Sequence, residues 1–283
     1  MNPPMASTSA VETTAAHIPA RPSGIARELA AIHVLWQRDI LRFFRQRSRV
    51  AGALIQPILF WLVLGTGLSG TFRMQGAEGV GYMEYFYPGV VLMVVLFTSI
   101  FTTMSLIEDR HAGFLQAVLV GPASRTSLVL GKTLGGTSIA MIQAVLFLCL
   151  APLAGFSLAS ISWPMLIAHL VLGSAGLTAL GFTIAWWLDS VQGYHAVMSV
   201  LLLPLWVLSG AMFPPPEGTI MATLMKLNPM SYAAAGVRRA LYGGTLPSGA
   251  SVGGASAALE LAVVAGMFVV TVALSARACR RPS

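Results

Sequence analysis

Charged residues are scarce in this sequence of 283 residues. Only 10% of the residues are Asp, Glu, Lys or Arg, and 56% are hydrophobic, whereas a soluble domain carries about 25% charged residues. The mean hydropathy is +0.76. So few charges cannot keep a surface of this size in water. The composition therefore excludes a soluble globular protein and predicts a membrane protein.

Cysteines and clustered histidines are also scarce. The two cysteines, Cys149 and Cys279, are too few and too differently placed for a disulfide framework or a metal site. The five histidines are scattered, with no pair at the four-residue spacing of a helical metal site, which argues against a membrane-embedded enzyme. Basic residues gather beside the apolar runs and form no general coat, so we expect no nucleic-acid partner.

A nucleotide-binding loop is missing as well. Gly131-Lys132-Thr133 looks like the end of the phosphate-binding pattern Gly-x-x-x-x-Gly-Lys-Ser/Thr, but Thr126 stands where the first glycine is required. The lysine also leads straight into an apolar run. We therefore expect no ATPase site, no metal and no cofactor bound by this chain.

Long apolar runs are what the sequence does contain. A helix that crosses about 30 Å of hydrocarbon needs about 20 mostly apolar residues, because it must satisfy its own backbone hydrogen bonds there. The sequence predicts an all-α polytopic membrane protein with six transmembrane helices. The six predicted spans are residues 50–70, 88–107, 133–154, 164–188, 194–213 and 257–276.

The basic residues predict the orientation of these spans. The terminal segments and the connections on their side carry 13 of the 17 Lys and Arg residues, and cytoplasmic loops are the ones enriched in Lys and Arg. Both termini are therefore expected in the cytoplasm. Residues 1–24 are polar and predict a disordered cytoplasmic tail, and residues 25–283 are expected to form a single transmembrane domain.

Residues 25–49 predict an amphipathic helix before the first span. Apolar and aromatic residues recur there at helical spacing, and arginines recur on another face. We expect this helix to lie in the cytoplasmic interface with its arginines toward lipid phosphates; the alternative is a basic flank with no further role. The residues assigned to the helix are Trp36, Arg38, Arg42, Phe43 and Arg45.

The connection between the second and third spans, residues 108–132, predicts a short cytoplasmic helix. Its apolar residues would form one ridge, and Gly121-Pro122 would end it. Such a ridge suits docking into a groove of a soluble partner. Lys132 is expected at the lipid headgroups. The ridge comprises Phe114, Leu115, Val118 and Leu119.

The connection between the fifth and sixth spans predicts an outer hairpin. Two short apolar helices would meet at Asn228-Pro229, because Asn is a good N-cap and Pro a good first helical residue. Each is too short to cross, so the pair is expected to be re-entrant or interfacial. Arg238 and Arg239 would anchor it at the headgroups or attract an anionic substrate.

The chain resembles the permease subunits of type 2 ABC exporters. The segment "LNPMSYAAAGVRRALYGG" and the predicted topology match that family. The motif that carries the resemblance comprises Glu108 followed by a charged pair, then Gly113, Leu115, Pro122, Ser124, Arg125 and Gly131-Lys132.

This resemblance implies a function as the membrane subunit of an ATP-driven exporter in a bacterial inner membrane. Residues 112–120 would be the coupling helix, held by Glu108 and Arg125 against the amphipathic helix or a separate ATPase subunit. ATP and Mg would bind that partner, and a second permease copy and membrane lipids would be further partners. A non-transporting anchor or assembly factor is the competing interpretation. The expected coupling residues are Glu108, Gly113, Phe114, Leu115, Val118, Pro122, Ser124, Arg125, Gly131 and Lys132.

Overall fold

The computed structural model describes residues 24–70, 80–121, 124–214, 219–246 and 253–280. The predicted tail, apart from Gly24, and Pro122 lie outside these ranges. The described residues form helices and no strand. The elements are α1 (Gly24–Arg45), α2 (Arg47–Leu68), α3 (Tyr82–Thr102), α4 (Met104–His111), α5 (Phe114–Val120), α6 (Arg125–Leu148), the 3-10 turn η1 (Ala151–Ala154), α7 (Trp163–Trp187), α8 (Val191–Val207), α9 (Ile220–Leu227), α10 (Pro229–Leu241) and α11 (Ala257–Arg280).

Among the described residues, five helical segments are long and apolar enough to cross a membrane. They are Val50–Leu68 of α2, Tyr82–His111 of α3 and α4, and the whole of α6, α7 and α11. The predicted span at residues 194–213 corresponds to α8, which is apolar but has only 17 residues. A helix of that length rises about 26 Å. The all-helical, multi-pass character is thus confirmed, with five spans by length and composition.

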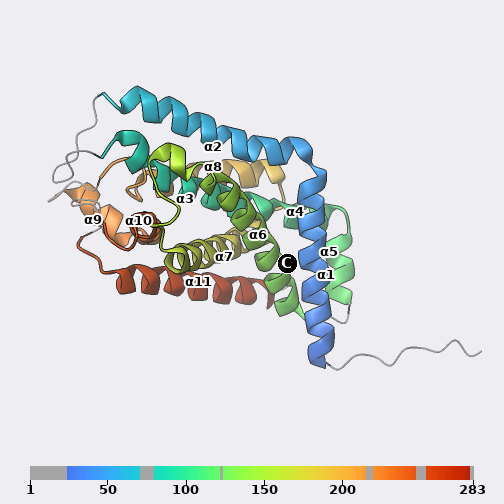
Figure 1. Cartoon of the computed structure of the whole chain (residues 1–283). Coiled ribbons are helices and arrows are strands. Elements are labelled where there is room, and N and C mark those ends of the chain that lie inside the picture. Colours follow the sequence, from blue (N-terminus) through green and yellow to red (C-terminus); the bar gives the residue numbers. More distant parts are fainter. Residues whose placement is uncertain (1–23, 71–79, 122–123, 215–218, 247–252, 281–283) are drawn as a thin grey trace, which may run out of the picture.

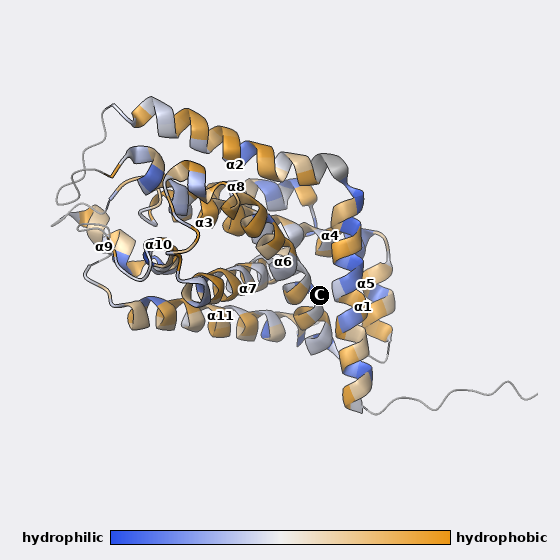
Figure 2. Ribbon diagram, viewed as in Figure 1, coloured by the Kyte–Doolittle hydropathy of each residue, from blue (hydrophilic) through white to orange (hydrophobic). Residues whose placement is uncertain are grey.

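The long helices form one bundle, and α1 crosses one end of it (Figure 1). The end of α11 lies at that same end, whereas α9 and α10 lie at the opposite end. Apolar residues dominate the long helices, and hydrophilic residues concentrate on α1 (Figure 2). The hydrophilic residues of α1 therefore lie at one end of the bundle.

Helix α3 is the centre of the bundle, with α2, α6, α7, α8 and α10 packed around it. Its first turns contain Tyr85, Phe86 and Tyr87, which are fully buried. Helix α8 runs along it: Trp206 Nε1 donates to the Gly89 carbonyl oxygen at 2.8 Å, and the Tyr194 hydroxyl donates to the Ile100 carbonyl oxygen at 3.0 Å. These two bonds fix α8 against α3 at both of its ends.

The connection predicted at residues 108–132 is mostly helical, which corrects the predicted boundaries. Helix α4 continues the second span through Glu108, and α6 begins at Arg125, before the predicted start of the third span. Gly113, with a φ of 74°, makes the turn from α4 into α5, a conformation that favours glycine. Lys132 is consequently a buried residue within α6 and does not lie at the headgroups.

The predicted outer hairpin consists of α9 and α10, which meet at Asn228. The Asn228 side chain accepts from the backbone N–H of Met230, and Pro229 is the first residue of α10. Neither arginine of α10 is free to anchor at headgroups. Arg238 is buried, donates to the Gly210 carbonyl oxygen at 3.0 Å and lies over the Tyr85 ring.

Arg239 forms a two-pronged ion pair with Glu260 of α11. The Nε–Oε2 and Nη2–Oε1 distances are 2.9 and 2.8 Å, and Glu260 is fully buried. A bidentate Arg–carboxylate pair is among the stronger polar contacts in proteins. The two arginines therefore join the hairpin to α3 and α11, and the prediction that they anchor the chain at headgroups is wrong.

Gly89 is the residue at which α3 packs closely against the residues that follow α8, so a substitution there tests this packing. A Cβ at this residue would lie 2.4 Å from the carbonyl oxygen of Ala211, which is backbone. Gly89→Ala should destabilise the protein by about 1–3 kcal/mol, as overpacking does. Thermal unfolding of the purified protein in one detergent measures this.

Gly173→Ala is the matched control. Gly173 is also buried inside a long helix, α7, but a Cβ there would meet nothing within 4 Å. It should be neutral or stabilising by up to about 1 kcal/mol. Equal unfolding midpoints for the two variants would contradict the packing described for α3.

Candidate functional site

Six charged side chains meet where α1 crosses the bundle. We call this set the ion-pair cluster. It contains three cations and three anions from three helices, which are Arg38, Asp39 and Arg42 of α1, Glu108 and Asp109 of α4, and Lys132 of α6.

Asp109 is the centre of the cluster. Its carboxylate accepts from Nη1 and Nη2 of Arg38, at 2.8 and 2.5 Å, and from Arg42 Nη1 at 3.1 Å. Arg42 Nη2 donates to Glu108 Oε2 at 2.5 Å. The arginines of α1 thus bind the carboxylates of α4, and the prediction that they face lipid phosphates is wrong for these two. Arg45 is exposed.

Lys132 completes the cluster from inside the bundle. Its Nζ donates to Asp39 Oδ1 at 2.9 Å, to Asp109 Oδ2 at 2.8 Å and to Ser105 Oγ at 3.1 Å. The lysine is 3% exposed and Asp109 is 1% exposed. All three protons of the ammonium have an acceptor, which is the condition under which a buried charge is tolerated.

Burial raises the pKa of the Asp39 carboxyl above its ordinary value, although the neighbouring Lys132 ammonium lowers it again in part. Removing a carboxylate from water disfavours its charged form, and a cation nearby favours it. The charged form of Asp39 is therefore favoured by the neighbouring Lys132 ammonium.

Two glycines of α6 let α1 approach this closely. A Cβ at Gly131 would lie 2.8 Å from the Leu35 Cβ, and a Cβ at Gly135 would lie 3.1 Å from the Asp39 Cβ. Small residues allow helix backbones to pack tightly. Trp36 adds a hydrogen bond to Ser138 Oγ at 3.0 Å, and the Phe43 side chain is buried.

Helix α5 is fixed to the rest of the chain by its apolar side. Leu115 is 3% exposed, the guanidinium of Arg38 lies 3.8 Å from the centre of the Phe114 ring, and Val118 packs against the core. The predicted ridge thus faces this chain and does not point outward. The outward side consists of Ala112, Gly113, Gln116, Ala117 and Val120, which are all exposed; we call it the α5 face.

The start of α6 is held from two sides. Ser124 caps the helix by accepting from the Ser127 N–H at 3.1 Å, and Glu28 of α1 accepts from the Ser124 N–H and hydroxyl at 3.0 and 2.6 Å. These hydrogen bonds lower the pKa of Glu28. Arg125 donates to the Cys279 carbonyl oxygen near the end of α11, so it holds α11 and not α5.

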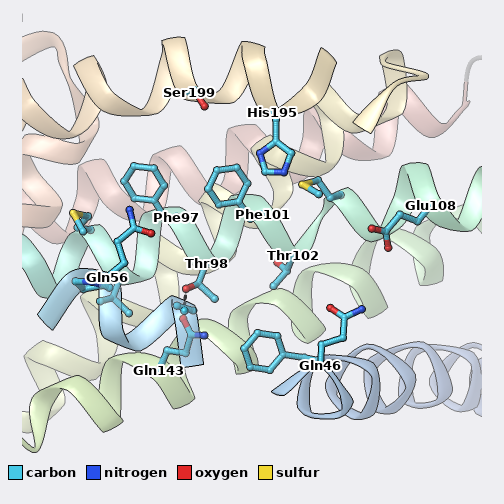
Figure 3. Close-up of a pocket in the computed structure, with 17 residues that line it drawn as sticks. Gln46, Gln56, Phe97, Thr98, Phe101, Thr102, Glu108, Gln143, His195 and Ser199 are labelled. Atoms are coloured by element: carbon cyan, nitrogen blue, oxygen red, sulfur yellow. Dashed lines mark hydrogen bonds between the residues drawn. The ribbon is translucent and has the colours of Figure 1, made fainter. Parts of the chain in front are cut away.

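A cavity of about 640 Å³ adjoins the ion-pair cluster and extends into the bundle (Figure 3). Side chains from six helices line it, and Glu108 lies at the end nearest α1. The lining combines amides and hydroxyls with aromatic rings. The labelled residues are Gln46, Gln56, Phe97, Thr98, Phe101, Thr102, Glu108, Gln143, His195 and Ser199.

The sequence did not single out Asp39 and Asp109. Both lie beside an arginine, in the pairs Arg38-Asp39 and Asp109-Arg110. The orientation was predicted from the Lys and Arg residues alone, so these two acidic residues did not enter the count. The available signal was that each is an acidic residue in a strongly basic or apolar stretch. Such a residue needs a partner when its helix is buried.

Comparison with known proteins places the chain in one family. Residues 30–242 match the family model described as "ABC-2 type transporter". The matched region runs from α1 to the end of α10, so it includes the ion-pair cluster, α5, α9 and α10.

Three relatives illustrate the range of similar proteins. The chain is 28% identical to "Putative transport permease ycf38" of Porphyra purpurea over 73% of this chain and 72% of that protein. It is 24% identical to "Daunorubicin resistance ABC transporter permease protein DrrB1" of Streptomyces coeruleorubidus over 92% and 89%. It is 25% identical to "Inner membrane transport permease YadH" of Escherichia coli (strain K12) over 75% and 83%.

Lys132→Met tests the cluster. It leaves the Asp39 carboxylate buried without its ammonium, and breaking a buried ion pair in this way costs about 3–5 kcal/mol. Arg45→Gln, an exposed cation on the same helix as Asp39, should change stability by less than about 0.5 kcal/mol. Thermal unfolding of both variants measures the difference, and equal midpoints would contradict a structural role for the cluster.

The pH dependence of Lys132→Met gives a second test. Without the ammonium, burial and the Asp109 carboxylate raise the pKa of Asp39, and Arg38 alone of its cationic neighbours still lowers it, so the protonated form favours the folded state more than in the wild type. That contribution is complete below the unfolded pKa of about 3.9 and is lost as pH rises through the folded pKa. The stability deficit of the variant relative to the wild type should therefore shrink as the pH is lowered from neutral toward the unfolded pKa. Adding Asp39→Asn should remove this pH dependence.

Proposed function

Because the chain belongs to the ABC-2 type transporter family, we propose that it is the membrane-spanning subunit of an ATP-driven exporter and that α4 and α5 couple it to a separate ATPase. The family consists of transport permeases without an ATPase motif of their own, which generally act with ABC ATPase subunits. The observation that carries the coupling role is the α5 face, which is exposed while the other side of the same helix is fixed.

The geometry supports rigid transmission from α5. Arg38 contacts Phe114 and Asp109, so α1, α4 and α5 share one side chain. Arg110 of α4 donates to Asp189 Oδ1 at 2.5 Å and to the Trp186 carbonyl oxygen at 2.7 Å, which joins the end of α4 to the turn between α7 and α8. A push on α5 would then reach the helices around the cavity, since packed elements move as units.

In the proposed arrangement α8 is the sixth crossing and both termini are cytoplasmic, as the distribution of basic residues indicates. The α1 end of the bundle would then face the ATPase, and α9 and α10 would form a re-entrant or interfacial hairpin on the outer side. ATP and Mg would bind the ATPase, and a second permease copy would complete the pathway in a bacterial inner membrane.

The identity of the transported compound is also part of this proposed function. One relative is named for resistance to daunorubicin and another for nodulation, so similar proteins are named for different processes. A non-transporting anchor or assembly factor would not need a cavity that reaches from the α1 end into the bundle. This cavity favours transport.

Val120→Asp tests the coupling role. Val120 is 89% exposed, so the change should leave folding intact but place a charge on the α5 face. We expect wild-type protein, affinity-purified from its own membrane, to retain a soluble subunit that hydrolyses ATP, and the variant to lose at least about tenfold of it, the loss expected for about 1.4 kcal/mol of contact energy. Mass spectrometry and ATPase assays measure the retained subunit.

Ile220→Asp is the control, because Ile220 is 83% exposed but lies in α9 at the opposite end of the bundle. It should retain the ATPase at the wild-type level. The proposal is overturned if wild-type protein retains no ATPase, or if Val120→Asp retains and stimulates it as wild type does.

A further inference from the structure

Gln143 places an unused hydrogen-bond donor at the cavity. The residue is 1% exposed, and its Nε2 has no hydrogen-bond partner among the described residues. Its Oε1 accepts from the Thr98 hydroxyl, which fixes the orientation of the amide (Figure 3). A primary amide nitrogen carries two donors, and buried donors are nearly always paired. The wall of the cavity therefore contains a buried donor whose acceptor is not supplied by the described residues of this chain.

The charges of the side chains that line the cavity limit the kind of ligand that can carry this acceptor. Glu108, the one carboxylate at the cavity, is already paired with Arg42 at 2.5 Å, and no lysine or arginine is among the described lining residues. His195 is the other ionisable side chain, and its ring centre lies 5.0 Å from that of Phe101. A charged head would lose its hydration without gaining a counter-ion, which is unfavourable. Amides and hydroxyls instead suit an uncharged head with oxygen atoms.

An open apolar face of α2, which we call the α2 groove, adjoins this cavity. Its side chains are largely apolar, and it shares Gly52 and Gln56 with the cavity. The side chains that extend it away from the polar part are Ile55, Leu59, Phe60 and Val63. A polar and an apolar compartment therefore meet at Gln56, which matches the two parts of an amphiphile.

We propose that the cavity binds the uncharged, oxygen-bearing head of an amphiphile through Gln143, and that the α2 groove holds its apolar tail. The size of the cavity is in the range of ligand sites, about 300–1,000 Å³. This inference rests on the proposed transport function and adds the chemical class of the substrate. Thr98 acts as a positioning residue, because it orients the amide that makes the contact.

Binding of short alkyl compounds to the full chain tests the class. Wild-type protein in lipid nanodiscs, without an ATPase, is titrated with n-hexyl β-D-glucoside, n-hexyltrimethylammonium and n-hexyl sulfate, and binding is followed by thermal shift. The glucoside should raise the unfolding midpoint saturably, and both charged compounds should bind at least about tenfold more weakly. Equal binding of the three compounds would show partition into lipid only and would overturn the proposal.

Variants locate the head. Gln143→Leu should weaken glucoside binding by about tenfold, the loss expected for one well-placed hydrogen bond. Thr98→Val keeps the amide but releases its orientation, so it should weaken binding severalfold and provides a second test if the first variant folds poorly. Gln192→Leu, a glutamine exposed in the first turn of α8 and outside both compartments, should bind as wild type. Unchanged binding by Gln143→Leu overturns the proposal.

The length of the alkyl group on the glucoside tests where the apolar tail binds. Affinity should rise from butyl to hexyl to octyl glucoside, and Phe60→Ala should reduce that gain without changing butyl binding. If a second copy of the chain covers α2 instead, length will have no effect, which overturns the tail site. If the protein retains an ATPase but binds no glucoside, this inference alone is refuted. If it binds the glucoside but retains no ATPase, only the coupling role is refuted.

Discussion

The structure depends on a buried ammonium group shared by two carboxylates. Lys132 of α6 joins Asp39 of α1 to Asp109 of α4, and each of these carboxylates would be costly to bury alone. The three helices are therefore bound to one another by charge as well as by apolar packing. Because α5 follows α4 directly and contacts Arg38, the position of the proposed coupling helix is set by the same group of charges.

This constraint also connects the two halves of the site. Glu108 belongs to the ion-pair cluster and lines the cavity, so a displacement of α4 relative to α1 would change both. A coupled transporter needs such a shared element, since an equilibrium at one site can affect another only through a structure that both sites influence. The cluster supplies three cations and three anions to this shared element.

Much of the fold follows from the sequence, because a long apolar run in a membrane protein has few alternatives to a helix. The predicted first residues of three spans, near Val50, Trp163 and Ala257, agree with the first residues of the corresponding spanning segments. The errors lie where charged residues are buried. Lys132 and Arg238 were placed at the boundary because hydropathy treats each charge as exposed, whereas each has a partner far along the chain. Such pairing depends on tertiary contacts that no local pattern contains.

The distance along the chain between the partners of the cluster has a consequence for synthesis. Asp39 is made 93 residues before Lys132, which at about 5–20 residues per second is a delay of roughly 5–20 s. For most of that interval neither α4 nor α6 has been made, so the charged residues of α1 have no partner from the cluster. Pairing of α1 with the bundle must therefore wait until α6 has been made.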